Sequence, residues 1–331
     1  MSKKGVPHFL AAGAFVLFLV LAQACTTSSA VKNAASIDEL TSLSDKIAWL
    51  NANVESGGNY VLEVNEDSSL GTTTGNIMGN LGKNLLGDLV HAEKTPIYDV
   101  NFIFKDKSDI TITLRGIGGK QTITTYLKDG IFLVGSGVTL ILDDNILLKG
   151  VPTGSPTDTL TSVVHVNSGG ILIMNDGSGI EGNMSFQDGG GVYVANGGTF
   201  IMNGGIITGN QCFQPQDQAL VMASNGQANA LSETPRRGGG VFVDVGGTFT
   251  KTGGTITGYA SDPQKGNVTK SFNELSVTQN NGHAVFAALG TPATALFSST
   301  VIGSKRKETT AGPDVDLQIN SDGTFSGGWD F

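Results

Sequence analysis

Hydrophobic residues alternate with polar ones in short runs over most of the chain. The runs with the clearest period of two are Tyr60–Val64, Val100–Phe104, Ile110–Leu114, Ile131–Val134 and Val138–Leu142. This period predicts β-strands with one buried face, and the Gly, Asn and Asp residues between the runs predict turns. No helical pattern separates these runs. The chain is therefore expected to be all-β rather than a doubly wound α/β sheet.

A helical period precedes the strands. The apolar positions three or four apart are Ile37, Leu40, Leu43, Ile47 and Leu50. Ser36 and Glu39 have the spacing of a capping box, in which each side chain bonds a free backbone N–H at the start of a helix. We therefore predict a helix that begins after Ser36 and ends near Leu50, within an N-terminal cap of residues 36–58. A weaker helical pattern spans Leu70–Thr95, where glycines lower the helix propensity.

The chain contains an internal repeat of short strands and turns. Equivalent strands follow the glycine-rich turns at spacings of 32, 28 and 49 residues and begin at Thr139, Ile171, Thr199 and Thr248. One repeat holds three short strands: Val192–Val194, Thr199–Met202 and Ile206–Thr208. Three strands per repeat, with length differences confined to loops, are typical of a parallel β-helix whose coils stack about 4.8 Å apart. We predict this architecture for residues 59–331.

The glycine doublets are expected to mark the corners of the coils. Gly197-Gly198 and Gly246-Gly247 occupy equivalent positions, and glycine tolerates the positive φ that sharp turns require. The alternation also predicts which side chains point inward to form a narrow core: Val192, Val194, Phe200 and Met202.

Three insertions interrupt the predicted coils, near residues 70–95, 211–237 and 259–281. The second and third fall between equivalent repeats. We therefore expect them to emerge close together on one side of the solenoid, where they are candidates for partner binding. The tail that ends at Trp329 and Phe331 is expected to cover the C-terminal end of the stack.

Residues 1–24 have the pattern of an export signal. Lys3 and Lys4 precede an apolar run from Phe9 to Ala22, which is too short for a membrane-spanning helix. The stretch that ends at Ala24-Cys25 resembles the lipobox of bacterial lipoproteins, which makes Cys25 the predicted lipid attachment site. A polar tether would then occupy residues 25–35. A conventional cleavage site and a secreted form without lipid remain the alternative. Thr26 in place of an aspartate favours the outer membrane over inner-membrane retention.

Charge and composition exclude several classes of function. The net charge of −9 becomes −11 when Lys3 and Lys4 leave with the signal, which argues against nucleic-acid binding. The basic clusters, Arg236-Arg237 and Lys305-Arg306-Lys307, are short and are expected to be solvated loop charges. The run from Gly116 to Thr122 lacks the first glycine of a phosphate loop.

No cofactor or metal site is predicted from the sequence. The candidate ligands His91, His165 and His283 are widely spaced and lack partners at metal-ligand spacing.

One pair of carboxylates is a candidate for catalysis. The repeat aligns Asp143-Asp144 with Asn175-Asp176, so Asp144 and Asp176 are expected to lie on adjacent coils about 5 Å apart. Such a pair suits a retaining glycosidase or a calcium site. The same column holds Asn203-Gly204 in the next repeat, which favours a turn requirement over chemistry.

Taken in order, the chain resembles a group of right-handed, single-stranded parallel β-helix lipoproteins of the spirochaete-type cell surface, with a pectin-lyase-like solenoid. The motifs that carry the resemblance are the lipid cysteine, ITITLRGIGG at Ile110–Gly119, VGSGVTLILDDNILLKG at Val134–Gly150, the glycine-rich repeats and the closing GGW. The resemblance covers roughly residues 36–331. It implies a fold and a location at the cell envelope, but no reaction.

These observations predict a non-catalytic surface lipoprotein. It would be anchored to the membrane by its lipid and present a β-helix for adhesion or for binding glycans or surface proteins. Two alternatives stay open. One is a polysaccharide lyase or hydrolase that uses Asp144 and Asp176, and the other is a purely structural envelope protein.

Overall fold

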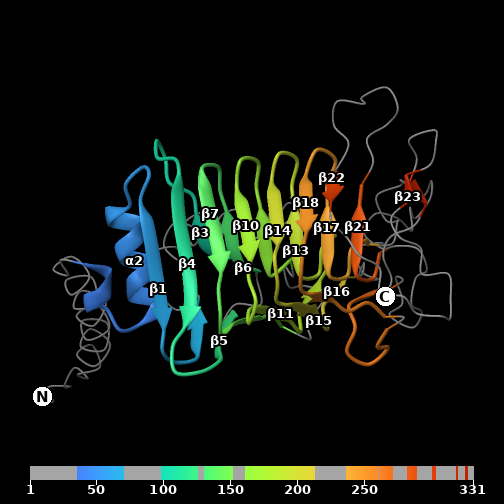
Figure 1. The fold of residues 1–331 in the computed structure, drawn as a ribbon, viewed down its shortest axis with the longest axis horizontal. Coiled ribbons are helices and arrows are strands. Elements are labelled where there is room, and N and C mark those ends of the chain that lie inside the picture. The colour runs from blue at the N-terminus through green and yellow to red at the C-terminus, as the bar shows by residue number, and fades with distance from the viewer. Residues whose placement is uncertain are drawn as a thin grey trace, which may run out of the picture.

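The computed structural model describes residues 36–70, 98–125, 130–151, 161–212, 236–259, 261–270 and 282–288, together with the backbone of residues 300–302, 318–319 and 325–326. Within these residues the chain is mostly β, and parallel strands pair in four sheets, here called A to D. The strands form a row that begins beside helix α2 and extends through β21 (Figure 1). The predicted signal peptide, Cys25, the tether, the helical pattern after Leu70 and the Trp329 tail lie outside the described residues.

Sheet A has seven strands, in the order β1 (Asn59–Val64), β4 (Ile110–Gly116), β7 (Val138–Leu142), β10 (Ile171–Met174), β14 (Thr199–Met202), β18 (Thr248–Lys251) and β22 (Thr300–Ile302). Sheet B has six, in the order β2 (Ser68–Leu70), β5 (Gln121–Thr125), β8 (Ile146–Lys149), β11 (Gly179–Glu181), β15 (Ile206–Thr208) and β19 (Thr255–Ile256).

Sheet C also has six strands, in the order β3 (Tyr98–Phe102), β6 (Gly130–Val134), β9 (Val164–Val166), β13 (Val192–Val194), β17 (Val241–Val243) and β21 (Val285–Ala287). Sheet D has three: β12 (Met184–Ser185), β16 (Gln211–Cys212) and β20 (Val268–Thr269). A separate antiparallel pair joins β23 (Gln318–Ile319) and β24 (Phe325–Ser326).

From β3 onward, successive strands enter sheets C, A and B in the same order. One such set is called a unit below. The predicted alignment of the repeat is the observed register, because Ile171 pairs with Thr139 and with Thr199, and Thr199 pairs with Thr248. Strands that return to the same sheet beside their equivalents are compatible with a parallel β-helix or solenoid.

The structure differs from the predicted repeat in its fourth strand. In three units a two-residue strand of sheet D follows sheet B, at β12, β16 and β20. β16 and β20 occupy residues that the sequence assigned to the insertions near 211–237 and 259–281. Two-residue strands carry no detectable alternation, so the periodicity could not reveal them.

The N-terminal helix begins later than predicted. Ile37–Glu39 forms a short 3₁₀ turn, η1, and Ser36 makes no side-chain capping bond. Helix α2 spans Leu43–Asn53, and Ser42 is its N-cap because its Oγ accepts from the Asp45 N–H at 3.1 Å. The sequence holds two S-x-x-acid patterns six residues apart, and the second one starts the α-helix. The apolar face of α2 packs into the main core, and Lys46 Nζ donates to the Glu63 carbonyl.

The core follows the predicted alternation. The side chains of Val192, Val194, Phe200 and Met202 are 0% exposed. Equivalent residues of neighbouring units lie against each other, as in the stacked rings of Phe200 and Phe249, whose centroids are 5.0 Å apart. The strands stack like on like, so one narrow core runs through the sheets.

The first glycine of each doublet serves close packing between units. Gly197 has a φ of 74° and Gly246 a φ of 81°, in the left-handed region that glycine adopts without strain. A Cβ on Gly197 would lie 2.6 Å from the Oγ of Ser168, and one on Gly246 would lie 2.9 Å from Asn196 Oδ1. A polar side chain of one unit therefore packs directly against the glycine of the next unit.

A buried column of asparagines joins three units at another corner. Asn183, Asn210 and Asn267 immediately precede the three strands of sheet D and are at most 2% exposed. The Asn210 side chain donates to Asn267 Oδ1 at 2.9 Å, and its Oδ1 accepts from the Asn183 N–H at 3.2 Å. These amides satisfy backbone groups that the turn would otherwise leave buried without partners.

Candidate functional site

An open groove of about 420 Å³ crosses the turns that follow the strands of sheet C. The residues that line it are Ile103, Gly135, Ser136, Asn167, Ser168, Ala195, Asn196 and Asp244. Five of them directly follow β3, β6, β9, β13 and β17. The groove therefore runs across the strands, along the stacking direction of the units.

Backbone hydrogen bonds place these five residues in one row. Gly135 N–H donates to the Phe102 carbonyl and Asp244 N–H to the Val194 carbonyl, and the intervening units repeat the same bond. The row reads Ile103, Gly135, Asn167, Ala195, Asp244. Large and small side chains alternate, and neighbouring strands lie about 4.8 Å apart, so large side chains recur about every 10 Å. Gly135 is buried beneath its neighbour, since a Cβ there would lie 2.9 Å from Ile103 Cγ1. Ala195 is partly exposed and lines the groove between Asn167 and Asp244.

A second row of exposed polar side chains borders the groove. Ser136, Ser168 and Asn196 follow the first row by one residue. Each lies over a positive-φ glycine of the next unit: Gly169, Gly197 and Gly246. The corner glycines thus hold hydroxyl and amide groups at regular intervals beside the groove.

Asp244 is the single ionisable residue among the described residues that line the groove. It is half-buried. Its Oδ2 accepts from the Tyr193 hydroxyl at 3.0 Å and its Oδ1 from the Val245 N–H at 2.7 Å. Within the described residues, no lysine or arginine forms an ion pair with it. The Asp244 carboxylate is therefore oriented by two neutral hydrogen-bond donors, and no positively charged side chain of the described residues neutralises it.

Behind the groove, an aromatic ladder lines the outer face of sheet C. Its members are the ring residues Tyr98, His165, Tyr193, Phe242 and Phe286. His165, Tyr193, Phe242 and Phe286 are consecutive partners in the sheet register. His165 and Tyr193 stack with centroids 4.6 Å apart, and Tyr193 and Phe242 stack at 5.2 Å. The rings pack against one another, so this ladder supports the wall of the groove and does not present a free aromatic face to a ligand.

The ladder holds its polar members neutral at neutral pH. Burial lowers the pKa of His165 to about 4, although the Asn167 side chain and the Asp244 carboxylate act in the opposite direction. Burial and the nearby Asp244 carboxylate raise the pKa of Tyr193 well above its usual value. Tyr193 therefore stays protonated and donates its hydrogen bond to Asp244.

The lowered pKa of His165 makes a testable contribution to stability. Its pKa is about 4 in the folded state and about 6.5 in an unfolded chain, so the unfolded state binds more protons between these values. Stability is therefore expected to fall as the pH drops from about 6.5 to 4, by up to about 3 kcal/mol from this residue. Urea unfolding across this range should show the loss in the wild type and a smaller one in His165→Phe. Parallel stability curves for the two proteins would contradict the assignment.

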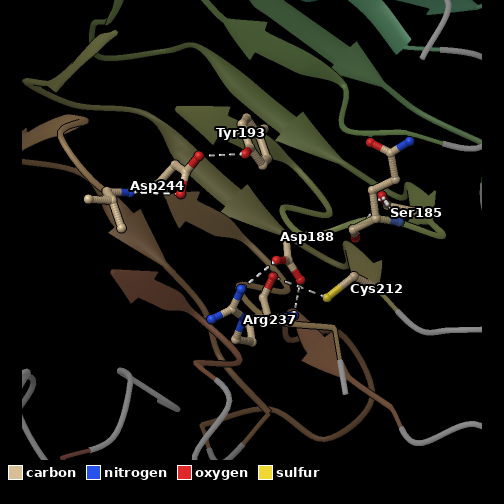
Figure 2. Close-up of polar contacts among 8 residues, drawn as sticks. Ser185, Asp188, Tyr193, Cys212, Arg237 and Asp244 are labelled. Carbon is tan, nitrogen blue, oxygen red and sulfur yellow. Dashed lines mark hydrogen bonds and ion pairs between the residues drawn. The ribbon is translucent and has the colours of Figure 1, made fainter. Parts of the chain in front are cut away.

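The insertion between Cys212 and Arg236 is fastened at its base. Figure 2 shows Arg237 reaching Asp188 beside Cys212. The Asp188 carboxylate accepts from the Arg237 N–H at 2.8 Å and from its guanidinium at 3.0 Å. The same guanidinium lies 5.0 Å from the ring centres of Phe242 and Phe286. Arg237 is therefore a structural clamp rather than a free loop charge, contrary to the expectation for the Arg236-Arg237 cluster.

Cys212 belongs to this clamp and has no sign of reactivity. It is a free cysteine with 0% exposure, and its thiol donates to the Arg237 carbonyl at 3.5 Å. Burial raises the pKa of the thiol, which keeps it protonated and poorly nucleophilic.

The second and third predicted insertions leave the sheets at adjacent points. Lys270 N–H donates to the Cys212 carbonyl at 3.0 Å, and Gly239 N–H donates to the Gly282 carbonyl at 3.0 Å. Residues 213–235 and 271–281 themselves lie outside the described residues. The expectation that the two segments emerge close together on one side therefore stays a prediction.

The predicted carboxylate pair lies at a corner of sheet A, away from the groove. Asp144 and Asp176 are both exposed and occupy equivalent turns after β7 and β10. Their neighbours form an exposed polar ladder in which Arg115 donates to Asp143, Asn175 to Asp143, Asn203 to Asn175 and Thr252 to Asn203. Arg115 holds the pKa of Asp143 below its usual value against the opposing effect of burial. The corner is thus built from paired polar groups.

The histidines have separate roles. His165 belongs to the aromatic ladder. The His283 ring accepts from the Thr269 N–H at 2.9 Å and lies near Tyr259. His91 lies outside the described residues. Among the residues that the structure describes, no group of three or more His, Cys, Asp or Glu side chains is placed to hold a metal ion.

The groove and the ladder escaped the sequence analysis. Their members come from different units, with 28 to 49 residues between equivalents from His165 to Phe242. The sequence does contain a signal for them, the repeated four-residue pattern VHVN, VYVA and VFVD, in which a ring residue is followed two positions later by a groove residue.

No helix of the described part of the chain is long and apolar enough to cross a membrane. Comparison with family models, with curated proteins and with solved structures finds no significant match.

Proposed function

We propose that the chain is a lipid-anchored protein of the bacterial cell envelope that binds a linear glycan along the groove. The observation that supports this best is the groove itself, whose lining residues repeat at equivalent positions of five strand ends. A surface that repeats every unit suits a ligand that repeats along its own length. A compact small molecule would find no enclosed pocket there.

The proposal includes a right-handed parallel β-helix with three main strands per coil. The parallel sheets and the repeated C, A, B order support the coils. The strong preference of parallel connections for the right hand supports their handedness. Helix α2 is proposed as the N-terminal cap. It precedes β1 where a sheet C strand would stand in a complete unit, and its Leu43, Ile47 and Leu50 belong to the common core.

The anchor is proposed from the sequence. A leader that ends at Cys25 and a polar tether before residue 36 would place the β-helix at the outer membrane or the cell surface, as in the lipoproteins that the chain resembles.

The chemistry of the groove favours a glycan. Serine and asparagine side chains donate to and accept from sugar hydroxyls, and the second row supplies them at regular spacing. The acidic net charge of −9 and the Asp244 carboxylate disfavour nucleic acid. The binding is proposed to be non-catalytic, since Asp144 and Asp176 lie at a different corner, beside the polar ladder of sheet A.

The test compares two tryptophan variants of the same unit. Asn196 and Asn203 are both exposed and stand at opposite ends of β14, and Asn196 alone lines the groove. In full-length protein kept in detergent, Asn196→Trp is expected to weaken binding to polysaccharides by about tenfold or more, while Asn203→Trp stays within about twofold of the wild type. Affinity electrophoresis against neutral, acidic and amino polysaccharides measures this. Equal binding by the two variants, or no binding by the wild type, would overturn the proposal.

A further inference from the structure

We infer that the Asp244 end of the groove selects a glycan with free amino groups, so the ligand class is a linear amino-sugar polymer. The inference rests on the proposed glycan-binding function and adds the identity of the sugar. It starts from Ala195, a small groove residue that lies between Asn167 and Asp244 in the first row and beside Ser168 and Asn196 of the second.

The Asp244 carboxylate is oriented for a cation. Tyr193 and the Val245 N–H each use one of its two oxygens, and every carboxylate oxygen can accept more than one hydrogen bond. Acceptor sites therefore remain toward the groove. An ammonium group beside Ala195 could donate to the carboxylate and to the side-chain oxygen of Asn196.

No neighbouring cation competes for this carboxylate among the described residues. Arg237 precedes β17, whereas Asp244 follows it. The Arg237 guanidinium forms an ion pair with Asp188 and lies over the rings of Phe242 and Phe286. His165 is neutral at neutral pH, and Tyr193 is a protonated donor. A half-buried negative charge without a counter-ion is an unfavourable arrangement that a bound ammonium would relieve.

The rest of the groove favours a sugar over a basic peptide. The second row presents hydroxyl and amide groups and repeats with the units, which matches a polymer with hydroxyls on every residue. At the opposite end the groove is bounded by Ile103, which is 56% exposed and suits an apolar sugar face or an acetyl methyl group. Polyanionic glycans are disfavoured because Asp244 would face their carboxylates.

The experiment measures the affinities of four probes of similar length for the full-length protein. The probes are a glucosamine oligomer with free amines, its fully N-acetylated form, an oligogalacturonate and oligolysine. The wild type is expected to bind the free-amine oligomer about tenfold more tightly than the N-acetylated one. The preference should shrink at about 1 M salt, where the Debye length is about 3 Å. Asp244→Asn should abolish the preference, and Asp176→Asn, an exposed carboxylate outside the groove, should retain it.

A second variant separates loss of the charge from loss of the fold. Ala195→Leu keeps Asp244 but places a larger side chain in the groove beside it, so it is expected to weaken the binding of both glucosamine oligomers. Equal affinity of the wild type for these two oligomers would overturn the inference and leave the proposed function standing. Failure of every glycan to bind would overturn both. Oligolysine bound as tightly as the free-amine oligomer would refute the assignment to a sugar.

Discussion

Replacing Asn210 with alanine is expected to lower the free energy of unfolding by about 3–5 kcal/mol, because several buried groups lose their partners at once. The Asn210 amide donates to the carbonyls of Ile180 and Thr208 and to Asn267 Oδ1, and its oxygen accepts from the Asn183 N–H. The residue is 0% exposed, so water cannot replace these bonds without entering the corner. Urea unfolding at neutral pH, monitored by circular dichroism, measures the loss.

The same unit provides a matched control. Asn203 also bridges two units through side-chain bonds, but it belongs to the exposed ladder of sheet A. Asn203→Ala is therefore expected to cost less than about 1 kcal/mol, since solvent satisfies the groups it leaves. Similar losses in the two variants would show that burial of the Asn210 column does not determine its contribution.

Gly238→Ala is expected to be the second strongly destabilising change, with a cost of about 3 kcal/mol or more. Gly238 has a φ of 69°, which an alanine adopts only with strain. In addition, a Cβ there would lie 2.4 Å from the Val241 carbonyl oxygen, a backbone atom held within sheet C. The backbone would have to shift beside the Arg237 clamp. Thermal unfolding of the variant measures the effect.

Gly57 separates the two causes. Its φ of 75° is nearly the same, but a Cβ on Gly57 would have no other atom within 4 Å. Gly57→Ala should therefore show the conformational cost alone, about 1–2 kcal/mol. Equal losses in the free energy of unfolding for Gly238→Ala and Gly57→Ala would show that the close approach between the turn and Val241 adds no measurable cost.

The sequence was sufficient for the register of the strands, and the reason is physical. Inward residues of each repeat contact the same positions of the next repeat, so a one-residue slip would turn Phe200 and Met202 outward. The start of the helix was less determined. Ser36 and Ser42 both precede an acidic residue by three positions, and the choice of Ser42 follows the packing of Leu43, Ile47 and Leu50 into the core.

The candidate site was harder to predict because its residues face outward. Outward positions carry no apolar period, and only the register of the strands brings the groove residues together. Gly135 and Ala195 belong to the groove because Ile103, Asn167 and Asp244 stand beside them in neighbouring units. In the sequence alone, nothing distinguishes Gly135 and Ala195 from other small residues. Asp144 and Asp176 do align as predicted, but alignment alone did not assemble a site around them.

The length of the row of groove residues depends on the number of units that contribute to it. Each of the five strand ends that line the groove contributes one residue to the row, so duplication or loss of one of these units would lengthen or shorten the row by about 4.8 Å. The long spacings between sheet A strands arise after β2, after β16 and after β19, and the units from β4 to β14 are more evenly spaced. Under the proposed glycan binding, a change in the number of units would therefore alter the length of polymer bound, while the Asp244 carboxylate would still determine the sugar preferred at its end.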